Sequence, residues 1–275
     1  MTRPRISAIS YLNTAPLMWD FEHGPAGESF DITYTLPFQC ARELAQGEAD
    51  IGVIPSAAYA SIPGLAVLPG VAIASRGAVR SILLVSSKPV EEVRSVALDN
   101  SSMTSVALVR ILFEKLWGGA RRFESLAPDL DTMLAEHDAA LLIGDRALTV
   151  DRSRYQTWDL AEEWIRFTGK AFVFAFWAVR EEALKKTNLD LVTIFQESRD
   201  HGLEPQNRRR IAQVWAQKLS LEEGDIERYL TGNIYYVLDQ ACLEGLELFY
   251  RYAAELKVLP RIPKLRFLSA KPALI

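Results

Sequence analysis

Apolar and polar positions alternate in two different periods along the N-terminal part of the chain. Runs typical of strands lie at residues 6–10, 31–36 and 48–56. Between them, residues 39–46 have helical spacing that stops at Gly47, and Thr14 and Pro16 favour a second helix start. The order strand, helix, strand, helix, strand predicts a parallel sheet with right-handed crossovers.

A second α/β unit follows, and a helical tail closes the chain. Further strands are predicted at residues 65–75, 79–86, 95–98, 123–126, 139–143 and 172–179. Helical spacing predicts helices among them at residues 106–117, 130–136 and 160–167. From residue 181 onward the pattern predicts helices only, at 181–198, 205–218, 221–230 and 235–256.

Two extended passages, near residues 86–94 and 168–178, join these units and predict a two-lobed molecule. The aromatic strand returns the chain to the first unit, so one lobe is expected to hold residues 1–88 and 178–275, and the other residues 89–177. Ligands bind outside the carboxyl ends of strands in open α/β sheets, and domain interfaces are favoured pockets. We therefore expect a ligand cleft between the lobes, lined by the strand ends at Asn13, Ser56, Ser102 and Asp145.

Composition narrows the class of protein. The chain is 49% hydrophobic and 24% charged, as in ordinary globular proteins, and its net charge of −4 argues against nucleic acid as the main partner. The two cysteines and three histidines lack metal-ligand spacing, so we expect no metal site. The longest apolar run, residues 171–179, is too short to span a bilayer, and no apolar leader precedes the first strand. We expect a cytoplasmic protein without membrane contact.

Four hydroxyl residues gather where the strand at 95–98 gives way to the helix at 106–117. In the segment Asp99-Asn100-Ser101-Ser102-Met103-Thr104-Ser105, Ser101 or Ser102 is the natural N-cap. The first backbone N–H groups of a helix lack internal partners and carry the positive end of its dipole. The segment is therefore either a seat for a carboxylate or phosphate, or a helix cap rich in hydroxyls.

The chain also resembles a known family in several motifs. Residues 42–52 resemble the helix-Gly-x-x-Asp-strand passage of periplasmic type II solute-binding folds. The passage from Ile9 to Leu17, which contains Tyr11-Leu12-Asn13-Thr14, resembles the opening of the chorismate dehydratases of the futalosine route to menaquinone. Four later motifs resemble the same family in the right order, at residues 54–57, 101–105, 144–148 and 172–180. The resemblance covers Arg5 to about Leu259, and one departure is Lys170-Ala171, where Leu-Pro is expected near the hinge.

This resemblance implies a periplasmic-binding-protein type II-like fold and a lyase. The enzyme would remove water from chorismate to give 3-[(1-carboxyvinyl)oxy]benzoate, without metal or organic cofactor. Loss of the C3 hydrogen gives an anion delocalised into the ring carboxylate, and expulsion of the C4 hydroxyl makes the ring aromatic. The protein must hold a dianion and stabilise spreading charge, while the substrate's own enolpyruvyl carboxylate could serve as base.

Two residues are the candidates for the reacting centre. The amide of Asn13 can donate to a carboxylate or to the C4 oxygen, although Asn also suits a turn. Asp145 ends a predicted strand at the cleft and could act as an acid if burial raises its pKa. Its alternative role is an ion pair with Arg146 or a loop cap.

The remaining candidates are expected to bind substrate. Charge-assisted hydrogen bonds of about 1.5–3 kcal/mol each would let hydroxyls hold a carboxylate without arginine. Tyr11 and Met103 are expected to form an apolar wall around the ring, with Phe38 beside them. The full set expected to bind substrate is Tyr11, Ser56, Ser81, Ser101, Ser102, Met103, Thr104, Ser105 and Gly144.

Two alternative functions stay open. The naphthoate-forming synthase of the same pathway shares the architecture, but there we expect a catalytic histidine near the cleft, and none of the motifs contains one. A cytoplasmic binding or sensor domain for small carboxylates would use the same fold without chemistry. The oligomeric state does not follow from the sequence.

Overall fold

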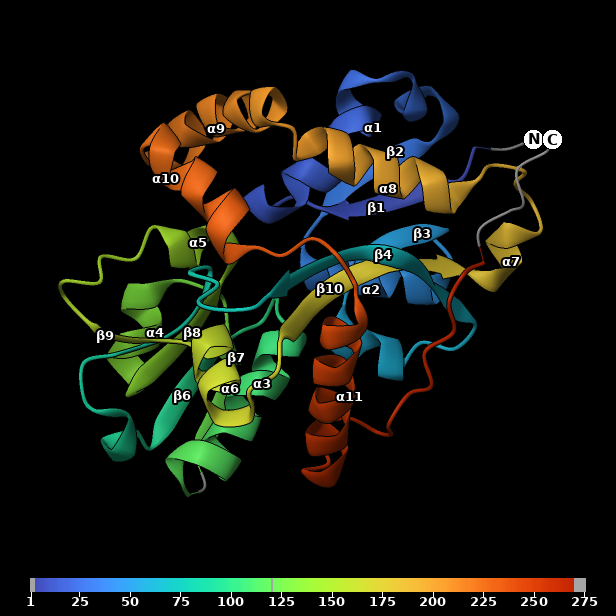
Figure 1. The fold of residues 1–275 in the computed structure, drawn as a ribbon. Coiled ribbons are helices and arrows are strands. Elements are labelled where there is room, and N and C mark those ends of the chain that lie inside the picture. Colours follow the sequence, from blue (N-terminus) through green and yellow to red (C-terminus); the bar gives the residue numbers. More distant parts are fainter. Residues whose placement is uncertain (1–2, 120, 270–275) are drawn as a thin grey trace.

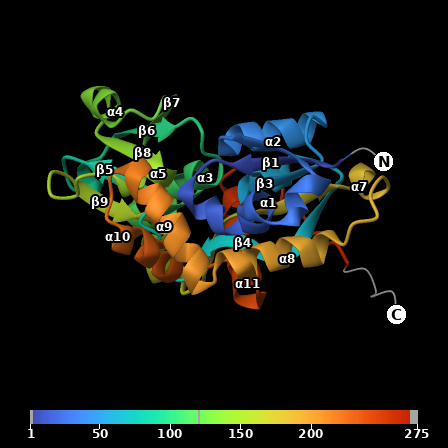
Figure 2. The same ribbon diagram turned by 90° about the horizontal axis from the view of Figure 1, so that it is seen from above.

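The molecule is an α/β structure built on two mixed β-sheets that lie side by side (Figure 1 and Figure 2). The computed structural model describes residues 3–119 and 121–269, and within this part of the chain each sheet has five strands. We call the part built on the first sheet lobe 1 and the part built on the second sheet lobe 2. The two-lobed α/β fold predicted from the sequence is confirmed.

The sheet of lobe 1 has the strand order β2-β1-β3-β10-β4. Strand β1 (Arg5–Ile9) runs parallel to β2 (Asp31–Thr35) and to β3 (Ile51–Pro55). The late strand β10 (Phe172–Arg180) lies antiparallel between β3 and β4 (Leu65–Ser75). Lobe 1 therefore combines strands from distant parts of the chain.

The sheet of lobe 2 has the order β7-β6-β8-β5-β9. Its strands are β5 (Ile82–Ser86), β6 (Ser95–Asp99), β7 (Arg122–Leu126), β8 (Ala139–Ile143) and β9 (Gln156–Asp159). The expected ranges placed β5 in lobe 1, whereas it pairs along its whole length with β8, because its apolar side chains fit the centre of the second sheet. All of β10 lies in the first sheet, so the chain crosses between lobes near residues 76–81 and 169–171. The expected ranges also include residues 1–2, 120 and 270–275, which lie outside the described residues.

The helices that flank the strands start close to where the sequence places them. In lobe 1, α1 (Trp19–His23) follows a 3₁₀ segment, Leu12–Met18, and α2 (Pro37–Gln46) ends at Gly47, whose φ of 74° suits glycine. The helices of lobe 2 are α3 (Thr104–Leu112), α4 (Leu130–Glu136), α5 (Gly144–Leu148) and α6 (Leu160–Thr168). Helix α3 continues as a π-helical turn at Phe113–Trp117.

The C-terminal region is helical, with more breaks than predicted. Its helices are α7 (Glu181–Leu184), α8 (Leu191–Gly202), α9 (Pro205–Leu219), α10 (Glu223–Arg228) and α11 (Gln240–Glu255). The single helix expected at 181–198 is divided, because Asp190 caps a new helix by accepting the N–H of Thr193. The helix expected from Tyr235 begins later, because Tyr235 forms a β-bridge with Ala74.

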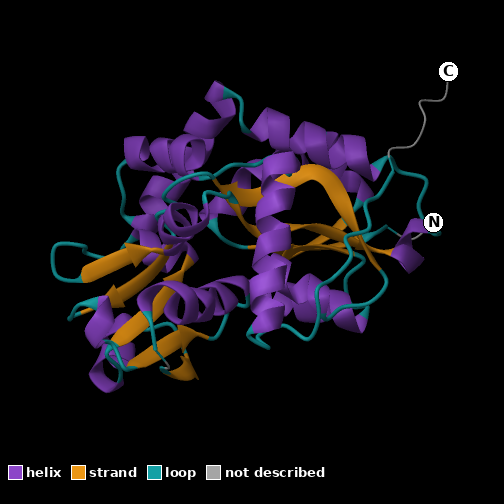
Figure 3. Ribbon diagram, turned by 60° about the horizontal axis from the view of Figure 1, so that its bottom comes forward, coloured by secondary structure: helices purple, strands orange, loops and turns teal. Residues whose placement is uncertain are grey.

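Helices of this tail connect the two lobes. Helix α11 stands beneath β10 in Figure 1 and packs against both β10 and α3 (Figure 3). Helix α9 contacts the 3₁₀ segment Leu12–Met18 of lobe 1, and α9 and α10 extend from there toward α5 of lobe 2 (Figure 1). Beyond α10, the phenol of Tyr229 donates to the Ser81 hydroxyl at 2.9 Å on the crossing segment. The tail thus holds the lobes together on two sides.

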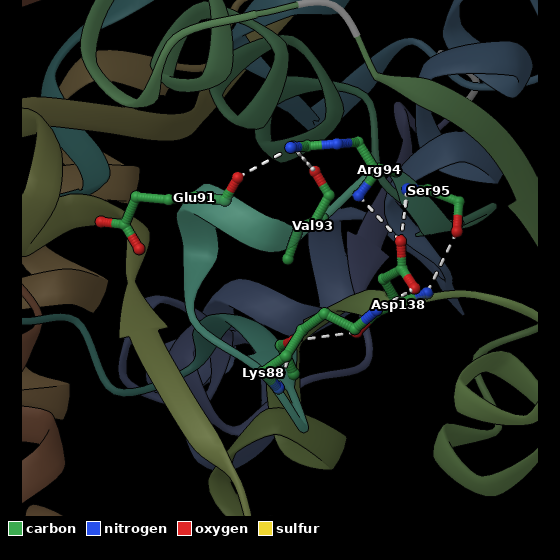
Figure 4. Close-up of polar contacts among 7 residues, drawn as sticks. Lys88, Glu91, Val93, Arg94, Ser95 and Asp138 are labelled. Atoms are coloured by element: carbon green, nitrogen blue, oxygen red, sulfur yellow. Dashed lines mark hydrogen bonds and ion pairs between the residues drawn. The ribbon is translucent and has the colours of Figure 1, made fainter.

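A polar network fastens the first loop of lobe 2 (Figure 4). The Asp138 carboxylate accepts hydrogen bonds from Lys88 Nζ at 2.7 Å and from the backbone N–H groups of Arg94 at 2.8 Å and Ser95 at 3.0 Å. The Arg94 guanidinium donates to backbone carbonyls of the same loop. These donors, the Lys88 ammonium first, lower the pKa of Asp138 to about 2.

Candidate active site

A small pocket lies between the lobes, at the carboxyl ends of β1, β3 and β8. Its cavity volume is about 50 Å³. Lobe 1 contributes Tyr11 and Asn13, and lobe 2 contributes the segment from Ser102 to Ser105 and Gly144. The predicted cleft therefore exists, and we call it the cleft pocket. Four predicted site residues are not part of its wall: Ser56, Ser81, Ser101 and Asp145.

Asn13 lies in the 3₁₀ segment after β1 and faces the cleft pocket. Its Oδ1 accepts a hydrogen bond from Thr14 Oγ1 at 3.3 Å. Burial raises the pKa of Tyr229 well above its ordinary value, although hydrogen bonds with Ser81 and Asn13 oppose this rise. Ser81 therefore belongs to a buried group behind Asn13, together with Tyr229, which the sequence analysis missed because nothing in the helical tail marks it.

Asp145 connects the lobes next to the cleft pocket. Its Oδ1 accepts the backbone N–H of Leu12 at 3.0 Å. Burial raises the pKa of this carboxyl group to about 6, against the Leu12 hydrogen bond and the positive charge of Lys218. The ion pair with Arg146 that the sequence allowed is absent within the described residues. The carboxyl group is thus poised to change protonation near neutral pH.

Gly144 and Tyr11 meet across the lobe interface. Gly144 has a φ of 62°, and a Cβ built on it would lie 2.7 Å from the ring of Tyr11. Its N–H donates to the carbonyl of Ser81 at 2.8 Å. The absence of a side chain therefore lets the phenol ring of Tyr11 lie flat against the backbone of lobe 2, where the ring forms one wall of the cleft pocket.

The predicted capping role of Ser101 and Ser102 is wrong. The N-cap of α3 is Met103, which makes no side-chain cap hydrogen bond. Ser101 instead donates through its hydroxyl (2.6 Å) and its N–H (2.9 Å) to Asp99 Oδ1, because this carboxylate lies only two residues upstream. The Ser101 hydroxyl also lies 3.4 Å from the hydroxyl of Tyr11. Ser101 thus links Tyr11 to a buried acid.

Asp99 is a buried acid next to the site, connected to Tyr11 through Ser101, and it was not among the residues expected from the sequence. It is fully buried at the end of β6, and its Oδ2 has no hydrogen-bond partner among the described residues. Burial raises the pKa of its carboxyl group. Its position directly before the hydroxyl segment was the only signal in the sequence, and an acid there is also an ordinary turn residue.

Thr104 uses its hydroxyl group to join the lobes, and the Ser56 hydroxyl lies beside it on the side of lobe 1. Ser56 Oγ donates to the carbonyl of Val173 at 2.8 Å, and Thr104 Oγ1 donates to the carbonyl of Phe174 at 3.0 Å. Thr104 Oγ1 also accepts the N–H of Ala57 at 3.1 Å. Both side chains are buried, and both donors are committed to backbone carbonyls of β10. These contacts fix the start of α3 against lobe 1.

Ser102 and Ser105 remain available to a ligand. Both line the cleft pocket at the start of α3, and neither hydroxyl has a hydrogen-bond partner in the part of the chain that the structure describes. The first N–H groups of α3 lie beside them. No lysine, arginine or histidine belongs to the described wall of this pocket. An anion there would be held by hydroxyls and a helix N-terminus.

Residues 3–119 and 121–269 contain no group of three or more His, Cys, Asp or Glu side chains that could hold a metal ion. Nor does any helix among them combine the length and apolar character that a membrane span requires.

Comparison with solved structures defines the class of fold. The chain is similar to a protein from Archaeoglobus fulgidus, with a TM-score of 0.72, 16% identity, and coverage of 92% of this chain and 97% of the other. It is also similar to the periplasmic aliphatic sulphonate binding protein SsuA from Escherichia coli, with a TM-score of 0.64, 16% identity, and coverage of 100% and 96%. The fold is therefore that of the periplasmic binding proteins, as expected.

Sequence comparison narrows this class. A family described as "Menaquinone biosynthesis" matches residues 4–255. The chorismate dehydratase of Thermus thermophilus is 30% identical over 280 residues, covering 95% of this chain and 98% of that protein. The chain belongs to the menaquinone biosynthesis family.

Proposed function

We propose that this protein is a carbon–oxygen hydro-lyase that dehydrates chorismate to 3-[(1-carboxyvinyl)oxy]benzoate in menaquinone biosynthesis. The observation that carries the proposal is the cleft pocket itself. It combines unpaired hydroxyls at a helix N-terminus with the amide of Asn13, in a chain whose full-length relative is a chorismate dehydratase. Such a pocket suits a carboxylate next to a reacting hydroxyl group.

Each side of the pocket has a separate role in this proposal. Ser102, Ser105 and the N-terminus of α3 hold one carboxylate of the dianion. The ring of Tyr11 and the apolar side chain of Met103 flank the ring of the substrate. The amide of Asn13 donates to the C4 oxygen as negative charge spreads. Asp145, with a pKa raised to about 6, lies outside the wall of the pocket, so its carboxyl group would assist the departing hydroxyl only after the lobes shift around the substrate.

The source of the base follows from what the wall contains. Among the described residues that line the cleft pocket, none is an Asp, Glu, His or Lys that could accept the C3 proton. This supports the enolpyruvyl carboxylate of the substrate as the base, because it is carried into the pocket with the reacting ring. The same absence of histidine disfavours the naphthoate-forming synthase.

The lobes must separate before substrate enters. Typical small-molecule sites measure about 300–1,000 Å³, whereas the cleft pocket measures about 50 Å³. The hydrogen bonds from Leu12 to Asp145 and from Phe38 to the carbonyl of Ser101 join the lobes directly. We propose that both break on opening and re-form around bound substrate.

The test is incubation of purified protein with chorismate, with the product identified by mass spectrometry. Asn13→Ala should lower kcat about 10²-fold or more and raise KM less, because its amide serves the transition state. Asn100→Ala, on the exposed end of the same hydroxyl segment, is the matched control and should retain activity. Binding of chorismate without product would reject the lyase and support a binding domain, and unchanged turnover in Asn13→Ala would leave Asn13 a structural residue.

A further inference from the structure

A second and larger cavity adjoins the cleft pocket. Its volume is about 330 Å³, and it lies between α9 and the segment that runs from β1 into α1. It shares Ile9 and Tyr11 with the cleft pocket, so the ring of Tyr11 stands between the two. We call this cavity the side chamber, defined by Tyr11, Trp19, Arg210, Trp215 and Lys218.

The side chamber contains two cations that are not neutralised. Arg210 Cζ lies 5.5 Å from the ring centroid of Trp19, and Lys218 Nζ lies 4.5 Å from that of Trp215. Neither cation forms an ion pair within the described residues. The wall also contains one acid, Glu22, which accepts the phenol hydrogen of Tyr34, so two cations face one carboxylate and the charge of the wall is positive. The chamber thus offers positive charge beside large aromatic faces.

The chamber is coupled electrostatically to the reacting centre. Lys218 acts on Asp145, whose pKa its positive charge lowers against the larger effect of burial. Both cations project from α9, the helix that arches from lobe 1 toward α5 (Figure 1). A negatively charged ligand in the chamber would therefore lie close to the route into the cleft pocket.

We propose that the side chamber is a binding site for a cyclic dicarboxylate, with Arg210 and Lys218 as partners of its carboxylates and Trp19 and Trp215 as its apolar walls. The ligand waits there before Tyr11 moves and the lobes admit it. The chamber has the size of a small-molecule site, which the cleft pocket lacks. The identity of the ligand as chorismate rests on the proposed function, whereas the existence of the site does not.

The direct test uses isophthalate, an unreactive benzene dicarboxylate. Calorimetry measures its affinity, and quenching of tryptophan fluorescence gives a second measure of binding. Loss of one charge-assisted contact at an exposed side chain should weaken binding about tenfold in Arg210→Met and in Lys218→Met. Arg210 is exposed, so the melting temperature of Arg210→Met without ligand should stay at the wild-type value.

The matched control is Arg209→Met. Arg209 precedes Arg210 on α9 but lies outside the chamber, 3.9 Å from Glu227. Removal of the same charge there should leave affinity unchanged. Wild-type protein that fails to bind isophthalate, or equal affinity in all three variants, would overturn the proposal.

The chorismate reaction separates this inference from the proposed function. If both stand, Arg210→Met should raise KM about tenfold with little change in kcat, because the lost contact precedes chemistry. Isophthalate binding that depends on Arg210 and Lys218, in a protein that forms no product, would reject the lyase and keep the chamber. Product formation with an unchanged KM and unchanged isophthalate affinity in the variants would reject the chamber alone.

Discussion

The backbone N–H of Leu12 donates to Oδ1 of Asp145 at 3.0 Å, and this hydrogen bond is one of those that join lobe 1 to lobe 2 near the cleft pocket. Burial raises the pKa of the carboxyl group from 3.8 to about 6. The folded protein therefore binds the proton more tightly than the unfolded chain. Ionised Asp145 destabilises the fold at pH values above 6, and this penalty fades as the pH falls from about 6 to about 4.

Asp145→Asn should raise the stability of the fold and lower catalytic turnover. The shift in pKa corresponds to a penalty of up to about 3 kcal/mol, and an Asn amide oxygen can still accept the N–H of Leu12. We expect the variant to melt at a higher temperature than wild type at pH 7.5, with the gain shrinking toward pH 4. Turnover of chorismate should fall nonetheless if Asp145 assists the leaving group.

Asp131→Asn, on the exposed surface of α4, is the control for this change. It should alter neither the melting temperature near neutral pH nor turnover. An Asp145→Asn variant with full activity would assign Asp145 to lobe closure alone. A variant that is less stable at pH 7.5 would show that the carboxylate is not penalised by burial.

Gly144→Ala tests the contact between the lobes at Tyr11. A methyl group at φ 62° carries backbone strain of about 1 kcal/mol, and it would also lie 2.7 Å from the ring of Tyr11. We expect a loss of stability and a loss of turnover, because the displaced ring deforms the cleft pocket. Circular dichroism melts and chorismate kinetics measure the two effects.

Gly169→Ala is a close match for the strain without the clash. Gly169 has a φ of 68°, and a Cβ there would meet nothing within 4 Å. This control should lose similar stability from strain but keep its activity. Equal activity in the two variants would mean that the position of Tyr11 does not matter for the reaction.

The fold was predictable where the apolar pattern is local, and less so where tertiary contacts decide. The strand at Gln156–Asp159 was missed because it lacks an apolar run and lies at an edge of the second sheet. Tyr235 has helical neighbours in sequence, yet the β-bridge with Ala74 holds it extended. The helix at 106–117 was placed well, but its start was set by the turn at Asp99 instead of by a serine cap.

The residues of the candidate site were likewise predictable only where they belong to short local motifs. Asn13, Ser102 and Gly144 stand in short motifs and line the cleft pocket as predicted. Tyr229 and Lys218 lie in the helical tail, where one tyrosine or lysine resembles any other. Their roles arise only when α9 and the segment after α10 fold back over the interface between the lobes. No local sequence pattern encodes this packing of the tail over the interface between the lobes.

Asp138→Asn should destabilise lobe 2 in a pH-dependent way. The carboxylate accepts from Lys88 and from two backbone N–H groups (Figure 4), and these contacts lower its pKa to about 2. The stabilisation is present above the unfolded value of 3.8 and is lost as the pH falls toward 2. We expect a loss of about 1–3 kcal/mol at pH 7 from weaker hydrogen bonds. Urea denaturation at pH 7 and at pH 2.5 measures the difference.

Glu92→Gln serves as the comparison for this loop. Glu92 is an exposed acid of the same loop, and its side chain takes no part in the described hydrogen bonds of Asp138, Lys88 and Arg94. The free energy of unfolding of Glu92→Gln should match that of wild type at both pH values. A difference between Asp138→Asn and wild type that is as large at pH 2.5 as at pH 7 would show that the charge is not the stabilising feature.

Two hydroxyls at the start of α3 lie in different environments. The Thr104 hydroxyl is buried between Phe174 and Ala57, whereas the Ser102 hydroxyl faces the cleft pocket and has no partner in the described chain. Thr104→Val keeps the shape of the side chain but leaves a carbonyl and an N–H unsatisfied, at a cost of about 1–3 kcal/mol without ligand. Ser102→Ala should leave the stability of the free protein unchanged.

With ligand bound, we expect Ser102→Ala instead of Thr104→Val to lose the larger part of the ligand-induced stabilisation. A dicarboxylate shaped like the proposed product, such as 3-(carboxymethoxy)benzoate, stabilises the folded protein in proportion to the logarithm of its affinity. If Ser102 holds a carboxylate, Ser102→Ala should bind about tenfold more weakly and lose about 1.4 kcal/mol of the stabilisation by saturating ligand. Thr104→Val should keep most of that stabilisation. Thermal melts of the three proteins with and without ligand decide the matter, and an equal ligand-induced shift in wild type and Ser102→Ala would remove Ser102 from the carboxylate site.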